Sequence, residues 1–188
     1  MKIIDKIKAL KGRHYLLLAG ALLALMVIFQ SQCHRFKTEV DITENQKTIL
    51  RNLGKKALLS NDVPVAAILV YKGEVIGEGY NTVKKDSNLG GHAEINAISD
   101  AYAKYGEAFH DLDRDELSLY STFEPCEMCK GAMLHYNIKN VYFEQAKEFG
   151  TQVKGTVKSF IFELKKRRFD ADGLQESMFE QHPDYDKQ

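Results

Sequence analysis

The chain has 188 residues, enough for one ordinary domain and an appendage. Its 26 basic and 26 acidic side chains give a formal net charge of zero, so composition offers no argument for a nucleic-acid partner. Apolar residues make up 44% of the chain, which supports a substantial core, and three cysteines exclude the disulfide framework of a small secreted domain.

Residues 1–33 combine a basic start with an apolar run. Four lysines and Arg13 precede a segment from Tyr15 to Phe29 in which every residue is apolar or glycine. As a helix, the uncharged stretch to Cys33 would span about 28 Å, close to the roughly 30 Å hydrocarbon core of a bilayer. Three interpretations stay open: a retained signal-anchor helix, a lipoprotein signal acylated at Cys33, or a cleaved signal peptide.

Positive charge flanks the N-terminal side of this run more strongly than its C-terminal side, where acidic residues soon follow. Because Lys and Arg favour the cytoplasmic side, we expect a membrane-anchored protein with residues 34–188 outside the cytoplasm. A linker over 34–42 would then separate the anchor from a domain over 43–150. A buried helix of a soluble domain is disfavoured because no polar face interrupts the run.

The chain from residue 43 reads as alternating helices and strands. Thr43-Glu44-Asn45-Gln46 fits a capping box and predicts a helix over 43–59. Strands are predicted over 63–71 and 74–80, joined by the turn Lys72-Gly73. The elements that follow are a polar loop over 82–91, a helix over 92–105, a surface loop over 106–116, a strand over 117–123, a helix from Pro125 to about Tyr136 and a strand over 138–143. Alternation after the hairpin indicates a mixed sheet covered by helices on both sides.

Two short motifs carry side chains suited to metal chemistry. His92 and Glu94 stand at the start of one predicted helix, and Cys126 and Cys129 follow Pro125 at the start of another. A histidine and two thiolates supply three zinc ligands and leave a fourth position for water, whose pKa zinc lowers to about 7. A carboxylate beside that water, here Glu94, can accept and deliver its protons.

Each motif taken alone has another explanation. His92 could cap its helix or lie in the core. Cys126 and Cys129 could form a redox pair or half of a structural zinc site, although no second C-x-x-C exists to complete a four-cysteine site. The joint presence of both motifs, each at a helix start, favours a catalytic zinc site.

These motifs make the chain resemble the cytidine/deoxycytidylate deaminase superfamily, in particular the branch of bacterial tRNA adenosine deaminases and guanine and cytosine deaminases. The likeness covers about residues 43–150. The matching runs are Val63-Pro64-Val65-Ala66-Ala67, Gly79-Tyr80-Asn81, His92-Ala93-Glu94-Ile95-Asn96-Ala97-Ile98 and Glu124-Pro125-Cys126-Glu127-Met128-Cys129. The resemblance implies a three-layer α/β/α sandwich with a central mixed sheet, which the N-terminal hydrophobic helix would precede.

The resemblance also implies how the site works. Zn²⁺ would be held by His92, Cys126 and Cys129, with Glu94 as the catalytic proton shuttle. Substrate contacts would come from Asn81, the Ala93 backbone and Val63, although Asn81 could simply end a strand and Val63 could be core. A homodimer is expected because dimers are common in this branch.

Three functions stay open at this stage. The leading one is hydrolytic deamination of a small nucleobase or nucleoside, because a domain outside the cytoplasm would not easily meet tRNA. The second is tRNA adenosine-to-inosine deamination. The third is a non-catalytic zinc or dithiol-redox protein.

Residues 151–188 lack the last strand and closing helix that are usual in this family, so we expect a divergent C-terminal extension. Its basic run Lys165-Lys166-Arg167-Arg168 could contact RNA or phospholipid headgroups, or it could be a solvated helix end. The tail over 175–188 is acidic and polar.

Overall fold

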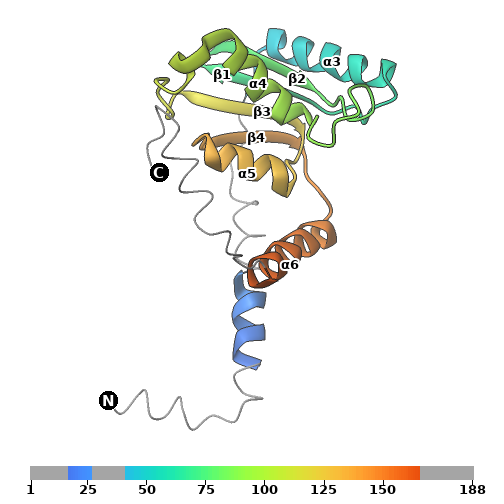
Figure 1. Cartoon of the computed structure of the whole chain (residues 1–188), viewed down its shortest axis with the longest axis vertical. Coiled ribbons are helices and arrows are strands. Elements are labelled where there is room, and N and C mark those ends of the chain that lie inside the picture. The colour runs from blue at the N-terminus through green and yellow to red at the C-terminus, as the bar shows by residue number, and fades with distance from the viewer. Residues whose placement is uncertain (1–16, 27–40, 166–188) are drawn as a thin grey trace, which may run out of the picture. The chain divides into compact units, whose positions relative to one another are not determined.

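The computed structural model of the chain describes residues 17–26 and 41–165 (Figure 1). Contacts between Cα atoms divide the chain into two compact units, residues 1–149 and 150–188. Both predicted chemical motifs lie in the first unit.

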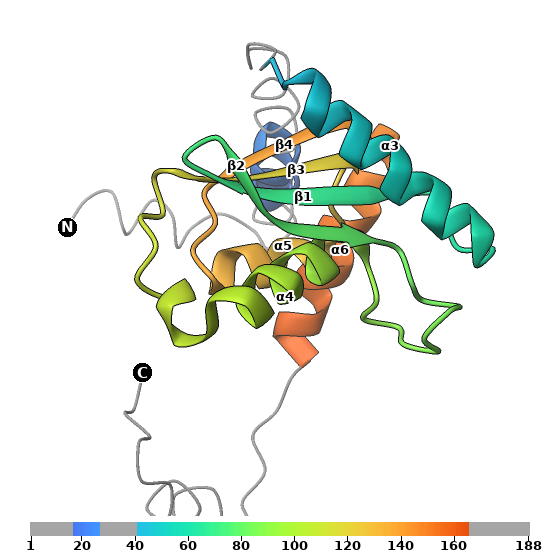
Figure 2. The same ribbon diagram turned by 90° about the horizontal axis from the view of Figure 1, so that it is seen from above.

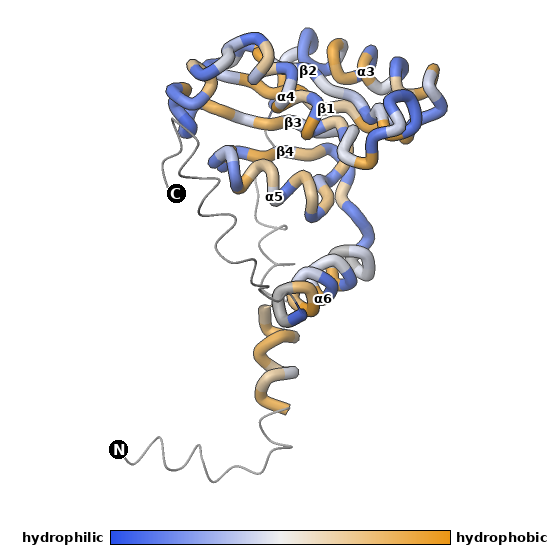
Figure 3. The backbone as a smooth tube through the Cα atoms, viewed as in Figure 1, coloured by the Kyte–Doolittle hydropathy of each residue, from blue (hydrophilic) through white to orange (hydrophobic). Residues whose placement is uncertain are grey.

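The expected membrane anchor is wrong. Residues 17–26 are helical and almost entirely hydrophobic (Figure 3). In the described part of the chain, no helix is both long and apolar enough to cross a membrane. The expectation of a membrane-anchored, extracytoplasmic domain is therefore withdrawn, and Cys33 and the linker up to residue 40 lie outside the described residues.

Four strands form one mixed sheet in the order β2-β1-β3-β4. They are β1 (Ala66–Tyr71), β2 (Glu74–Tyr80), β3 (Leu117–Phe123) and β4 (Asn140–Gln145). Strand β1 pairs antiparallel with both β2 and β3, whereas β3 and β4 pair parallel. Lys72 and Gly73 both have positive φ, as the tight hairpin turn between β1 and β2 requires.

Helices cover both faces of the sheet, which confirms the predicted three-layer sandwich (Figure 2). Helix α3 (Glu44–Leu59) lies on one face, and α4 (Ala93–Tyr105) and α5 (Glu127–His135) lie on the other. A short 3₁₀ helix, η1 (Gly106–Phe109), follows α4 in the segment that was predicted to be a loop. The sheet thus has a different helical cover on each side.

Helix α3 begins where the capping box predicts. The Gln46 amide donates to Thr43 Oγ1 at 3.2 Å, and the Thr43 amide donates to Gln46 Oε1 at 2.9 Å. Leu50 and Leu53 on its inner face are buried against Ile68 and Val70 of β1. Each fully buried leucine contributes about 1.5–3 kcal/mol relative to an exposed one, so burial of these apolar side chains stabilises the fold.

Helix α4 packs unusually close to β2. A Cβ atom at Gly77 would lie 2.2 Å from the Ala97 carbonyl oxygen, and one at Gly79 would lie 2.1 Å from the Ala93 carbonyl oxygen. Only glycine allows this approach. The distance between the first turn of α4 and the sheet is therefore set by the two glycines together with Ala93 and Ala97.

Helix α5 ends as predicted, with Tyr136 as its C-cap residue, but the next strand starts later than predicted. Asn137 has a positive φ of 54°, and the Ile138 amide donates to the Met133 carbonyl at 2.8 Å. This is the hydrogen bond of a helix C-cap in which the residue after the helix turns left-handed. Ile138 is buried as part of that cap, so β4 begins at Asn140 rather than at 138.

Helix α6 (Phe149–Lys165) lies in the second unit apart from its first residue, in the region where a divergent C-terminal extension was expected. It leaves Val157, Phe160, Ile161 and Phe162 exposed. Apart from Lys165, the basic run up to Arg168 and the tail lie outside the described residues.

Candidate metal centre

His92 is placed by the closed ends of the loop over 82–91. The Thr82 amide donates to the Gly91 carbonyl at 2.8 Å, which draws the two ends of the loop together. Asn96 Nδ2 on the first turn of α4 donates to Thr82 Oγ1 at 3.0 Å and to the Tyr80 carbonyl at 2.8 Å. His92 is the N-cap residue of α4 and has an extended backbone. Its side chain makes no capping hydrogen bond to the helix.

Cys126 and Cys129 flank the start of α5. Cys126 is the N-cap residue, and Cys129 lies one turn later, fully buried. The Lys130 amide donates to the Cys126 carbonyl at 2.8 Å, which is the first bond of the helix. Helix α5 starts slightly later than predicted. Pro125 precedes the N-cap residue and does not occupy the first helical position.

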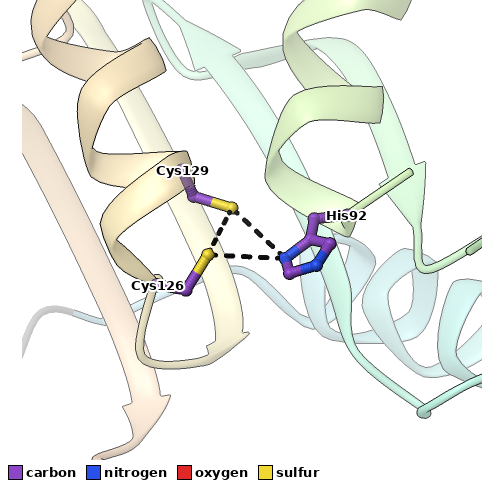
Figure 4. Close-up of side chains that lie close together, drawn as sticks. All are labelled: His92, Cys126 and Cys129. Atoms are coloured by element: carbon purple, nitrogen blue, oxygen red, sulfur yellow. Dashed lines mark hydrogen bonds between the residues drawn. The ribbon is translucent and has the colours of Figure 1, made fainter. Parts of the chain in front are cut away.

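The three predicted zinc ligands meet in one small triangle (Figure 4). Nδ1 of His92 lies 3.5 Å from Cys126 Sγ and 3.6 Å from Cys129 Sγ, and the two sulfur atoms are 3.5 Å apart. A tetrahedral zinc site with bonds of about 2.0–2.3 Å has edges of about 3.5–3.8 Å. The triangle therefore fits one face of a zinc tetrahedron and leaves the fourth corner for another ligand.

The thiols cannot both ionise easily without a cation. The side-chain hydrogen bond between Cys126 and Cys129 lowers the pKa of Cys126 to about 4. The same hydrogen bond, followed by burial, raises the pKa of Cys129. One proton is thus retained between two adjacent sulfur atoms, and a divalent cation in the triangle would replace it.

Glu94 lies beside the triangle. Its side chain is buried, the Cys129 thiol donates to its Oε2 at 3.4 Å, and the Ser121 hydroxyl lies 3.5 Å from its Oε1. Burial raises the pKa of the Glu94 carboxyl, although its own backbone amide and the Cys129 thiol oppose the shift. A carboxyl that accepts a proton readily suits a group that must carry protons in both directions.

The three predicted substrate contacts differ in their exposure. Ala93 is buried at the first position of α4. Asn81 is also buried, and its Oδ1 has no hydrogen-bond partner among the described residues. Val63 is 61% exposed and lines a groove of about 430 Å³ with Leu50 of α3 and Phe123 of β3, whose lining does not include the motif residues.

Sequence reasoning missed two groups near the centre. Ser121 occupies an inward position of β3, where Leu117 and Leu119 are the other inward residues. A polar residue inside an apolar alternation was a signal that could have been used. Lys147, which contacts the segment before Cys126, had no such signal because its position depends on the pairing of β3 with β4.

A sequence profile of the cytidine and deoxycytidylate deaminase zinc-binding region matches residues 43–145. The chain belongs to this deaminase family. The match includes all four motif residues of the candidate centre, and a zinc ion is the cofactor of the family.

Two tRNA-specific adenosine deaminases are among the curated proteins that resemble this chain. The tRNA-specific adenosine deaminase subunit tad2 of Schizosaccharomyces pombe is 37% identical over 102 residues, 53% of this chain and 25% of that protein. The tRNA-specific adenosine deaminase of Haemophilus influenzae is 36% identical over 108 residues, 57% of this chain and 60% of that protein. The match thus spans only a quarter to three fifths of these relatives.

Among solved structures, guanine deaminase from Bacillus subtilis superposes with a TM-score of 0.56 and 23% identity, covering 75% of this chain and 97% of that chain. This likeness shows a shared fold.

Proposed function

We propose that the protein hydrolyses the exocyclic amino group of a nucleobase, as the free base or the nucleoside, and releases ammonia. The observation that carries the proposal is the buried Glu94 carboxyl at 3.4 Å from Cys129 Sγ, beside the triangle of His92, Cys126 and Cys129. A structural zinc site needs four protein ligands and no adjacent free carboxyl.

The chain's own groups have separate tasks in this reaction. His92, Cys126 and Cys129 would hold zinc, which when bound makes water a better nucleophile at neutral pH. Glu94 accepts a proton as the water oxygen adds to the ring carbon that bears the amino group, and it protonates the adjacent ring nitrogen. It then carries the second water proton to the amino nitrogen, the carbon–nitrogen bond breaks, and ammonia leaves a ring carbonyl behind.

Asn81 supports a nucleobase as the substrate. Its buried Oδ1 lacks a partner among the described residues, and a buried acceptor of this kind costs about 1–3 kcal/mol until it is paired. An N–H group or hydroxyl of a base or nucleoside can supply that partner. We assign Asn81 to substrate binding, and Ala93 to the backbone wall of the same site. The assignment of Val63 to the base pocket stays a prediction.

Adenosine in tRNA is the second candidate substrate. Relatives named tRNA-specific adenosine deaminases, which match at 36–37% identity, support it. The expected extracytoplasmic location, which disfavoured tRNA, is withdrawn, whereas the formal net charge of zero still offers tRNA no electrostatic support. The candidates differ in whether a free base or nucleoside is sufficient.

The decisive experiment is ammonia release by the zinc-loaded full chain with adenine, guanine, cytosine, their nucleosides and a tRNA anticodon stem-loop. Inosine formation in the stem-loop is measured in parallel. Turnover of a free base or nucleoside supports the first candidate, and turnover of the stem-loop alone supports the second.

Glu94→Gln is the matched variant because it keeps the size of the side chain and removes its ability to carry protons. We expect zinc to remain bound while turnover falls about 10²–10⁴-fold, the usual contribution of general acid–base catalysis. If the wild type binds zinc and turns over no substrate in the panel, the non-catalytic zinc-protein hypothesis replaces both proposals.

A further inference from the structure

Lys147, just after β4, makes two hydrogen bonds to the segment that leads into Cys126. Its backbone amide donates to Glu124 Oε2 at 2.9 Å, and its Nζ donates to the Pro125 carbonyl at 2.8 Å. The Glu124 amide in turn donates to the Gln145 carbonyl at 2.8 Å. The end of β4 thus holds the residues that directly precede a zinc ligand.

The ammonium of Lys147 donates to the Pro125 carbonyl, which takes no part in the backbone hydrogen bonds of α5. The first backbone bond of α5 goes to the Cys126 carbonyl, so the Pro125 carbonyl lies outside the helix ladder. Pro125 is buried. A buried carbonyl without a partner costs about 1–3 kcal/mol, and a charged donor forms a stronger bond than a neutral one.

This bond also fixes the direction of Cys126. The Pro125 carbonyl and the Cys126 nitrogen belong to one planar peptide group. Holding the oxygen therefore orients the nitrogen of Cys126, and with it the bond from which the Cys126 side chain extends towards Cys129 and His92.

The position of the ammonium is electrostatically unusual. A lysine near a helix N-terminus meets the positive end of the helix dipole, which disfavours a cation there. Lys147 nevertheless places its ammonium on the residue immediately before the N-cap of α5. A specific bond to the Pro125 carbonyl accounts for this placement better than surface solvation does.

We propose that Lys147 is a positioning residue for the zinc ligand Cys126. The proposal rests on the proposed function, because it assumes that Cys126 binds the catalytic zinc. The ammonium keeps the Pro125–Cys126 peptide in the orientation that directs Sγ into the triangle. It touches neither the substrate nor the reacting atoms.

The test compares Lys147→Met, which keeps the aliphatic stem, with Lys147→Arg, which restores a cationic donor. Lys139→Met is the matched control, since Lys139 also flanks β4 and its ammonium forms an exposed ion pair with Asp115, away from the start of α5. The rate of zinc transfer from each full-length protein to a chelator is measured, together with the visible absorption spectrum of the cobalt-substituted protein.

We expect zinc loss from Lys147→Met to be about tenfold faster, at the low end of the range for groups that orient metal ligands. Its cobalt spectrum should depart from that of the wild type, whereas Lys147→Arg and Lys139→Met should resemble the wild type in both measurements. In a turnover assay, kcat should fall with KM unchanged.

Unchanged zinc loss and an unchanged cobalt spectrum in Lys147→Met would overturn the proposal. An equal loss of thermal stability with and without zinc, at an unchanged rate of zinc loss, would also overturn it and leave only general support of the fold. If Lys147→Met does not fold, Glu124→Gln weakens the other bond of the same contact and should accelerate zinc loss in the same direction. Because zinc loss and the cobalt spectrum need no substrate, they decide the role of Lys147 even if the wild type deaminates nothing.

Discussion

The two faces of the sheet are built on different principles. On the α3 face, a capped amphipathic helix places leucines on β1. On the α4 face, small residues bring the helix backbone against β2, and the first turns of α4 and α5 carry the candidate zinc centre. The position of the candidate zinc centre therefore depends on how closely the backbone of α4 approaches the sheet, and it does not depend on α3.

The reason is geometric. His92 and Glu94 flank Ala93, whose carbonyl lies over Gly79. An outward shift of α4 by an ångström would move both side chains away from the cysteines of α5. A similar shift of α3 would open a part of the core but would move no ligand.

The largest effect should come from Cys129→Ala on the α4 face. Structural zinc sites with four ligands bind with about 10–16 kcal/mol, so the loss of one ligand should weaken zinc binding by about 3 kcal/mol, roughly a hundredfold or more. Competition with a chelator measures this. Leu53→Ala on the α3 face is the control: it should cost about 2–5 kcal/mol of folding stability through its cavity and leave the zinc affinity of the folded protein unchanged. Equal zinc affinities for Cys129→Ala and the wild type would refute the ligand assignment.

Gly79→Ala should damage stability and metal binding together. The new Cβ would lie 2.1 Å from the Ala93 carbonyl oxygen and 2.4 Å from the Ala97 nitrogen, so α4 must move outward. We expect a loss of at least about 1–3 kcal/mol in urea unfolding, with weaker zinc binding in the molecules that still fold. A variant that lost stability but bound zinc as tightly as the wild type would show that the depth of α4 does not control the centre.

A smaller, pH-dependent effect is expected at Asp62, which connects the two faces. This buried carboxylate follows α3 and accepts hydrogen bonds from the Lys84 amide at 2.6 Å, Ser60 Oγ at 2.7 Å and the Lys85 amide at 3.2 Å. Burial by itself would raise the pKa of Asp62, but these hydrogen bonds outweigh it and lower the pKa below the ordinary 3.8.

The sign of the effect follows from that shift. The stabilisation is complete above the ordinary pKa of 3.8 and is lost as the pH falls through the lower pKa of the folded protein. Asp62→Asn should therefore be less stable than the wild type at neutral pH, and the difference should shrink in acid. Asp115→Asn, which removes only an exposed ion pair, should change little at any pH. A difference for Asp62→Asn that stayed constant down to strongly acidic pH would contradict the assigned shift.

What the sequence could predict depended on whether the signal was local. Strand β3 and the start of α3 match their predicted positions because an apolar alternation and a capping box are both encoded within a few residues. The triangle of His92, Cys126 and Cys129 was also predictable, since each motif stands at a helix start.

The remaining features depend on contacts that are distant in sequence or on competing local signals. Lys147 reaches Pro125 only because β3 and β4 are neighbours in the sheet. Ile138 looked like part of a strand, but the left-handed Asn137 recruits it into a helix cap. The expected membrane anchor rested on hydropathy alone, and within the described residues no helix is long and apolar enough to span a membrane.

The smallest expected effect has the opposite sign and contrasts the two faces most directly. Gly54 lies inside α3, and a Cβ there would meet only the Pro64 carbonyl oxygen, at an ordinary 3.8 Å. Gly54→Ala should therefore stabilise the protein by about 0.5–1 kcal/mol, the usual gain for alanine in a helix interior, and leave zinc affinity unchanged. Urea unfolding beside Gly79→Ala measures the contrast: the same substitution stabilises one face and disrupts the other, because only α4 approaches the sheet too closely to admit a methyl group. Destabilisation by Gly54→Ala would mean that the α3 face is as tightly constrained as the face that carries the site.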